Sequence, residues 1–272
     1  MEVKLGGLGK KERFQLGQLI KAHLPIITPK NAAVVLKITQ KKAAWLLSHW
    51  AHKGWLSRVK RGVYIPIPLQ TENPNVMVDE PWVIAKSLFS PCYVGGWSAA
   101  EHWDFTEQIF NSVMVLTTKR NNNLEMNLKG VTFKLKVIKP ERLFGIKSIW
   151  IEHHKVEVSD PTKTIIDSFN DPATVGGIRI AIDILDRYMT SEHKNIKLLY
   201  DYGIRMKNTA IFKRIGFIFE KKYPKEVDWI EKFHSKIKTG YSQVDPSVPG
   251  DALITSWGLW VPLKWKKGGL CD

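Results

Sequence analysis

Three positive charges surround the bend of a short predicted hairpin, and their chemistry is that of phosphate binding. The stretch at 54–67, GWLSRVKRGVYIPI, holds two runs of apolar and β-favouring residues joined by a turn. Gly62 supplies the positive φ of that turn, whereas folding does not require Arg58, Lys60 or Arg61. Such cations can reach phosphates or the minor groove of a duplex. The alternative is that they protect an exposed strand edge from aggregation.

A helix predicted just before the hairpin carries a second basic group, in the stretch QKKAAWLLSHWAHKG. Ala43, Leu46, Leu47 and Trp50 fall at helical spacing and form one apolar stripe. The opposite side is basic and aromatic, and no acidic residue occurs between positions 30 and 60. A helix fits the major groove and reads it with its first residues. The sequence therefore predicts DNA contacts at Thr39, Gln40, Lys41, Lys42, Trp45, Arg58, Lys60 and Arg61.

The net charge supports this prediction because most of it lies in one quarter of the chain. The 272 residues carry a formal charge of +15, and positions 1–68 hold 13 basic side chains against 2 acidic ones, which is +11. The remaining residues are close to neutral. This distribution favours a nucleic-acid module attached to a near-neutral body. A surface that is merely rich in lysine is the alternative.

Three helical patterns precede the hairpin and should position these side chains. The first covers about 11–23, with apolar residues at helical spacing. Thr28 and Pro29 form an N-cap and first-turn pair for a second helix, and Thr39 is a plausible N-cap for the third. Helix, short turn, helix and hairpin is the order of a winged helix-turn-helix, which we predict for residues 1–68.

Beyond this module the pattern predicts a linker and then a larger mixed domain at 80–272. Prolines interleaved with polar residues indicate a linker at about 66–79. A helix at 81–89, a turn at 93–95, and strands at 112–118, 131–138 and 155–158 are expected. Asp160 and Pro161 should begin a helix, and further helices are expected at 176–189, 194–203, 207–222 and 225–238. The predicted class is α+β, with a helical C-terminal part.

Candidates for catalysis in the second domain are few. Asp160 and Asp167 are seven residues apart and could share a helix face, although an N-cap role explains Asp160. His153 and His154 lie near glutamates, but neighbouring residues of a strand point to opposite faces and cannot readily share a metal. Glu101 and His102 could form an acid–base pair, although a structural role is typical of a lone histidine.

Other catalytic signatures are absent from the sequence. It contains no phosphate-binding glycine-rich loop, no GxSxG and no nucleotidyltransferase-type GS…DxD pattern. The two cysteines match no disulfide or metal framework. We therefore expect neither an enzyme nor a bound metal or cofactor. No stretch resembles a signal peptide or a membrane span, so a soluble, cytoplasmic protein is expected.

Five segments in order resemble the AbiEi family, the antitoxins of the AbiE abortive-infection systems. The winged-helix region ending in RGVY is followed by GGWSAAEHWDFTEQ, a V-x-V-x-T strand, DPTKTIIDSF and AIFKRIGFIFE. The similarity covers about 16–220. The last fifty residues, including WGLWVPLKW, match nothing in the family.

The resemblance implies a type IV antitoxin from a prokaryotic phage-defence operon. Family members bind inverted repeats upstream of their operon and repress it, which suggests two copies on one site. Their second domain opposes a toxin of nucleotidyltransferase fold, without needing a stable complex. By this resemblance, the residues important to the second domain are Trp97, Ser98, His102, Glu107, Gln108, Asp160, Thr164 and Asp167.

The sequence thus predicts a DNA-binding antitoxin and transcriptional repressor of its own toxin–antitoxin operon. Its expected partners are double-stranded operator DNA and a cognate toxin, and no membrane. Two alternatives remain open. One is a metal-dependent nuclease that the winged helix targets to DNA. The other is a plain transcription regulator whose second domain senses a ligand or a partner.

Overall fold

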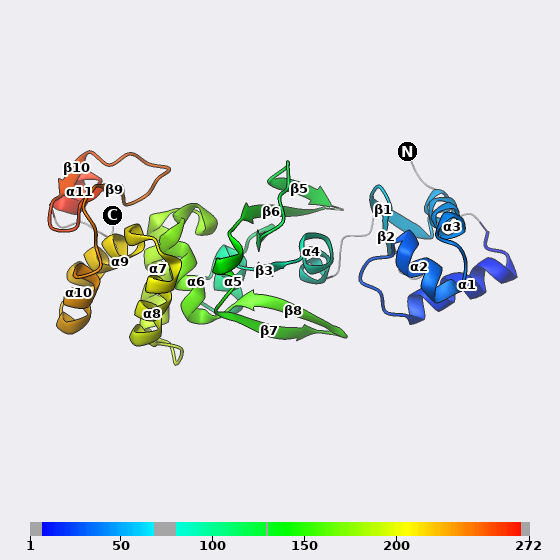
Figure 1. Ribbon diagram of the computed structural model, residues 1–272, viewed down its shortest axis with the longest axis horizontal. Helices are drawn as coiled ribbons and strands as arrows, with labels where there is room; N and C mark the ends of the chain where they lie inside the picture. Colours follow the sequence, from blue (N-terminus) through cyan, green and yellow to red (C-terminus); the bar gives the residue numbers. More distant parts are fainter. Residues whose placement is uncertain (1–6, 68–79, 129, 268–272) are drawn as a thin grey trace.

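Helices and strands alternate irregularly along the chain in the computed structural model, which describes residues 7–67, 80–128 and 130–267. Runs of helices lie at both ends and a mixed sheet lies between them (Figure 1). The fold is therefore of mixed α/β composition, as the α+β prediction stated. No helix in these ranges is long and apolar enough to cross a membrane.

The first part of the chain has three helices and a hairpin. Thr28 Oγ1 accepts a hydrogen bond from Asn31 N and begins the second helix, with Pro29 in its first turn. Thr39 Oγ1 accepts from Lys42 N at 3.3 Å and begins the third. Gly62, with φ of +74°, lies in the turn of the antiparallel hairpin. The elements are α1 (Lys10–Lys21), α2 (Pro29–Leu36), α3 (Gln40–His52), β1 (Leu56–Lys60) and β2 (Val63–Pro66).

The apolar stripe predicted for α3 is confirmed as the centre of a small core. Ala43, Leu46, Leu47 and Trp50 are all buried, against Leu16 and Leu19 of α1 among others. The pattern of α1 was less informative, because Phe14 is 68% exposed and Ile20 is 39% exposed.

The hairpin also packs against the next part of the chain. Val63 and Ile65 of β2 belong to the same core cluster as Val83 and Leu88 of α4 (Pro81–Phe89). The other side of the hairpin belongs to the first core, because Leu56 and Tyr64 are buried there. The hairpin thus connects two hydrophobic cores. The segment 68–79, which contains most of the predicted linker, lies outside the described residues.

A six-stranded mixed sheet forms the middle of the molecule, in the order β5-β6-β4-β3-β8-β7. Side chains of β4 alternate between its two faces: Val113 and Val115 pack with α4, whereas Met114 and Leu116 pack beside Trp97 of α5 (Gly96–His102). The strands are β3 (Cys92–Val94), β4 (Ser112–Thr117), β5 (Glu125–Leu128), β6 (Val131–Val137), β7 (Ile146–Ile151) and β8 (His154–Ser159).

The strand predictions at 112–118, 131–138 and 155–158 are confirmed, but the turn predicted at 93–95 is wrong. Residues Cys92–Val94 form β3, which pairs antiparallel with β4 and parallel with β8. The two following glycines indicated a turn, and only the neighbouring strands make this short segment part of a sheet. The strands β5 and β7 were not predicted.

Helices follow the sheet. Asp160 accepts a hydrogen bond from Lys163 N at 2.7 Å, as predicted for an N-cap, and begins α6 (Pro161–Asn170). The other predicted helices are present with ends shifted by a few residues. They are α7 (Ile178–Thr190), α8 (Ile196–Met206), α9 (Thr209–Lys222) and α10 (Val227–His234). Their apolar faces share one large core.

The end of the chain, for which the sequence offered no interpretation, packs on these helices. Trp257 and Trp265 are each 1% exposed and belong to the large core. A three-stranded sheet and a short helix carry them: β9 (Ser242–Gln243), β10 (Ala252–Ile254), β11 (Leu259–Val261) and α11 (Leu263–Lys266).

Candidate nucleic-acid interface and the buried cluster of helix α6

All eight residues predicted to contact DNA are exposed. Thr39, Gln40, Lys41 and Lys42 lie at the start of α3, and Trp45 follows one turn later. Arg58, Lys60 and Arg61 lie on β1 and the hairpin turn. Helix α3 packs directly beside the hairpin (Figure 1), so both groups belong to one region of the molecule.

Carboxylates of the described residues do not neutralise the cations of this region. Among the described residues, no ion pair within 4.0 Å involves Lys41, Lys42, Arg58, Lys60 or Arg61. The first turn of α3 contains no acidic side chain either. A helix N-terminus carries a partial positive charge, which adds to that of the two lysines. The region therefore attracts anions.

Glu12 of α1 neutralises the other end of α3. Its carboxylate lies 3.2 Å from His49 Nε2 and 3.0 Å from Lys53 Nζ. The hydrogen bond from Lys53, another from the Gly9 backbone and the nearby positive charges lower the pKa of Glu12. The exposed positive charge of α3 is thus concentrated at its beginning.

Trp45 lies on the exposed face of α3 with an ordered ring. Its side chain is 63% exposed, yet the indole stacks on the His49 imidazole with a centroid distance of 5.0 Å and an interplanar angle of 8°. The exposed indole lies one turn after the two lysines at the start of α3.

The hairpin turn lies close to a cation of the second part of the chain. Partial loss of contact with water lowers the pKa of the Lys60 ammonium, although the residue is exposed as a whole, and the charge of Lys119 lowers it further. Lys119 follows β4 and donates a hydrogen bond to the Leu88 carbonyl oxygen at 3.3 Å. Sequence reasoning missed Lys119, which belongs to the polar turn KRNNN. Two neighbouring cations favour an anion between them.

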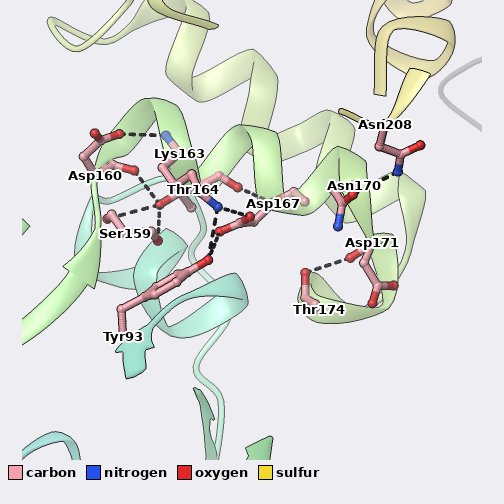
Figure 2. Close-up of polar contacts among 11 residues, drawn as sticks. Tyr93, Ser159, Asp160, Lys163, Thr164, Asp167, Asn170, Asp171, Thr174 and Asn208 are labelled. Atoms are coloured by element: carbon pink, nitrogen blue, oxygen red, sulfur yellow. Dashed lines mark hydrogen bonds and ion pairs between the residues drawn. The ribbon is translucent and has the colours of Figure 1, made fainter. Parts of the chain in front are cut away.

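A second polar cluster lies entirely inside the protein, at α6 (Figure 2). The ammonium of Lys163 pairs with the Asp167 carboxylate and donates a hydrogen bond to Tyr93 Oη at 3.1 Å. The hydroxyl of Tyr93 donates to Asp167 Oδ2 at 2.8 Å. All three side chains are at most 3% exposed. Burial raises the pKa of Tyr93 well above its ordinary value, and the charge and hydrogen bond of Asp167 add to this effect.

Asp160 and Thr164 form a separate network at the start of the same helix (Figure 2). Besides capping α6, Asp160 accepts a hydrogen bond from the Tyr202 hydroxyl at 2.8 Å. Thr164 Oγ1 donates to the Asp160 carbonyl oxygen and lies 2.8 Å from Ser159 Oγ. Burial raises the pKa of Tyr202 to about 12, and the hydrogen bond to Asp160 contributes. Asp160 and Asp167 are therefore engaged with different partners and do not form a carboxylate pair.

The end of α6 is held by a buried arginine. Arg214 of α9 is 4% exposed and donates to the Phe169 carbonyl oxygen at 2.7 Å and to the Gln243 carbonyl oxygen at 2.9 Å. It thus joins α6, α9 and β9. The sequence signalled Lys163 and Arg214 only weakly, because a basic residue inside an amphipathic helix is expected to be exposed.

The remaining residues implied by the family resemblance are dispersed. Trp97 is buried and its indole donates to the Ser112 carbonyl oxygen at 2.8 Å, while Ser98 Oγ accepts from Met114 N at 3.0 Å. These two residues attach α5 to β4. In contrast, the side chains of three others are exposed: His102, Glu107 and Gln108.

Two of these exposed residues contact other side chains. Burial lowers the pKa of His102, although nearby Asp104 opposes this, and the imidazole contacts the rings of Trp82 and Trp103. Glu107 forms an exposed ion pair with Arg187 at 2.7 Å. The eight residues therefore do not form one site.

The two neighbouring histidines that suggested a metal cluster are not part of one among the described residues. His153 lies in the turn between β7 and β8, and its ring contacts that of His23 with a centroid distance of 4.7 Å. In the part of the chain that the structure describes, no three histidine, cysteine, aspartate or glutamate side chains are grouped to hold a metal ion.

The whole arrangement has a counterpart among solved structures. No protein-family model and no curated protein matches this chain. The crystal structure of the RV2827C protein from Mycobacterium tuberculosis is similar, with a TM-score of 0.61 and 12% sequence identity. The match covers 94% of this chain and 93% of that one. At this identity the similarity shows the fold alone, and it extends over nearly the full length of both chains.

Proposed function

We propose that this protein binds operator DNA as a transcriptional repressor and that its larger part acts as a type IV antitoxin. In this proposal α1–α3 and the hairpin form a winged helix-turn-helix. The start of α3 enters the major groove, and the hairpin turn reaches the phosphates.

The observation that carries the DNA-binding part is the group of exposed cations that form no ion pair with the carboxylates the structure describes. Lys41 and Lys42 at the start of α3 and the basic hairpin turn combine with the positive end of the helix dipole. Glu12 contacts the opposite end of α3. A surface that served only to keep the protein soluble would not need positive charge at the start of α3 and neutralisation at its other end.

The antitoxin part rests on the ordered sequence motifs that resemble the AbiEi family. In the structure the DPTKTIIDSF segment forms α6 and its buried networks, and GGWSAAEHW forms α5 against the sheet. These motifs build the second domain. Its surface, rather than the buried cluster, would then oppose a cognate toxin of nucleotidyltransferase fold.

A gel-shift titration on the region upstream of its own gene tests DNA binding. We expect the wild-type protein to bind this duplex at least 100-fold more tightly than a random duplex of equal length. The variant Lys41→Ala/Lys42→Ala should lose at least tenfold in affinity. The matched control Lys197→Ala/Lys225→Ala, with two exposed lysines of the helical region, should bind like the wild type. Equal affinity for both duplexes would refute the proposal.

Co-expression tests the antitoxin part separately. The neighbouring reading frame is expressed with and without this protein, and growth is measured. We expect the neighbour to arrest growth and this protein to restore it, including as the Lys41→Ala/Lys42→Ala variant expressed from an independent promoter. A neighbour without toxicity would favour a plain regulator.

A further inference from the structure

Trp45 is a large, mostly apolar side chain within a group of exposed polar residues. It lies one turn after Lys41, in the middle of the exposed face of α3, and is 63% exposed. The other four residues predicted to contact DNA from this end of α3 are all polar. An exposed tryptophan is costly in water and is favourable when a partner covers it.

The plane of the Trp45 ring is fixed by a chain of contacts that leads to α1. The indole stacks on His49 with an interplanar angle of 8°. His49 Nε2 lies 3.2 Å from Glu12 Oε1. Glu12 is held in turn by Lys53 at 3.0 Å and by the Gly9 backbone N–H at 3.2 Å.

In this arrangement one face of the Trp45 indole packs on His49, and the rest of the ring faces solvent. The side chain is therefore pre-organised, so that little rotamer entropy is lost on binding. Its exposed part is apolar apart from the single N–H donor.

The chemistry of the major groove suggests what such a ring would contact. Base edges there present hydrogen-bond donors and acceptors, and the apolar group among them is the C5 methyl of thymine. Lysines instead pair with phosphates or with guanine. A rigid indole between two lysines and a histidine is suited to the methyl group.

We propose that Trp45 recognises thymine methyl groups in the operator and that His49 and Glu12 are positioning residues for its ring. This inference rests on the proposed DNA-binding function. It adds base discrimination to a surface whose lysines alone would supply affinity without much sequence preference.

Uracil substitution provides the test, because it removes the thymine methyl and keeps the base pairing. The duplex that the wild-type protein binds upstream of its own gene is prepared with thymidine and, separately, with deoxyuridine throughout. Wild-type affinity should fall at least fourfold on the uracil duplex, the effect of one buried methyl-sized group. Trp45→Ala should bind both duplexes with affinities equal within about twofold.

The positioning role of His49 has its own readout. His49→Ala should reduce the difference between the thymine and uracil duplexes while leaving the thermal unfolding midpoint and the affinity for random duplex nearly unchanged. His49→Phe, which keeps a stacking ring, should restore most of the difference. His52→Ala, which removes an exposed histidine of the same helix whose ring bonds the Ser48 carbonyl oxygen, is a matched control and should keep the full difference.

Failure of the inference and of the proposed function are distinguishable. In one outcome, the wild-type protein prefers its upstream duplex to random DNA but binds the uracil form equally well. This result overturns recognition of the thymine methyl and is consistent with the proposed function. An equal loss on all duplexes for Trp45→Ala also overturns it, since that result indicates a phosphate contact. Absence of any preference for the upstream duplex overturns both.

Discussion

At the scale of single residues, the buried pair Lys163–Asp167 shows why position in a motif does not establish a catalytic role. The two side chains are 0% and 3% exposed, and Tyr93 completes their hydrogen bonding. An ion pair removed from water is retained only when its partners satisfy it well. The cluster therefore joins α6 to the central strand β3.

Removing one member of this pair should be strongly destabilising. Lys163→Met leaves Asp167 buried without a cation, and we expect a loss of about 3–5 kcal/mol in the free energy of unfolding. Urea denaturation followed by circular dichroism measures it. Lys163→Met/Asp167→Leu should cost less than the sum of the single changes. Arg187→Ala, which breaks the exposed pair with Glu107, is the control and should change stability little. An unchanged midpoint for Lys163→Met would contradict the interpretation.

Cys92 should be unreactive in the folded protein. Burial raises the pKa of its thiol to about 11, and the thiolate is the reactive form. In a Cys271→Ser variant at pH 8, iodoacetamide should label Cys92 at least tenfold more slowly in buffer than in urea. Mass spectrometry measures the rate. Comparable rates in both solvents would indicate that the thiol is accessible.

The raised pKa of Cys92 should make the stability of the folded protein depend on pH. The unfolded thiol, with its ordinary pKa of 9.0, ionises before the folded thiol does. Between about pH 9 and pH 11 the folded state therefore binds more protons than the unfolded state, and stability should fall as the pH rises through this window. Cys92→Ala should flatten that decline in urea denaturation midpoints.

At the scale of elements, a close contact between Trp257 and Gly216 joins the C-terminal sheet to α9. The last sheet packs on α9 at Gly216, where an added Cβ would lie 2.1 Å from Trp257 Cζ3. The indole thus occupies the space that a side chain would fill. The absence of a side chain in the middle of α9 allows the C-terminal segment to pack against that helix.

Two glycine-to-alanine substitutions separate the steric contact with Trp257 from the effect of helix propensity. Gly216→Ala should destabilise the protein by roughly 1–3 kcal/mol because Trp257 must move. Gly17→Ala in α1, where nothing lies within 4 Å of the new Cβ, should stabilise it by about 0.5–1 kcal/mol. Urea denaturation measures both. Stabilisation by Gly216→Ala would contradict the packing of Trp257 on α9.

At the scale of the whole molecule, the cationic first part and the near-neutral remainder are joined through the hairpin. Val63 and Ile65 pack in one core with α4, while Ile27 pairs with Tyr64 on the other side. The hairpin therefore contacts α4 through β2 and α3 through β1.

Salt dependence should measure the proposed interface as a whole. If six phosphates are neutralised, the logarithm of the affinity should fall against the logarithm of the salt concentration with a slope of roughly −5. Lys41→Ala/Lys42→Ala should reduce the steepness by about 2. Fluorescence anisotropy between 50 and 300 mM salt would measure both slopes, and Lys197→Ala/Lys225→Ala should keep that of the wild type. An unchanged slope for the α3 variant would place the contacts elsewhere.

The sequence by itself determined the local features. Thr28 and Pro29, Thr39, and Asp160 with Pro161 begin their helices as predicted, because a cap depends on atoms within four residues. The buried stripe of α3 and the concentration of positive charge in residues 1–68 are likewise properties of the sequence order.

Only the tertiary structure decided the features that join distant segments. Cys92–Val94 is a strand because β4 and β8 lie on either side of it. Asp167 is a buried partner of both Lys163 and Tyr93, although Tyr93 lies more than 70 residues away in the sequence. Lys119 lies near Lys60 because the hairpin packs on α4. These outcomes depend on long-range packing, which overrides local preference.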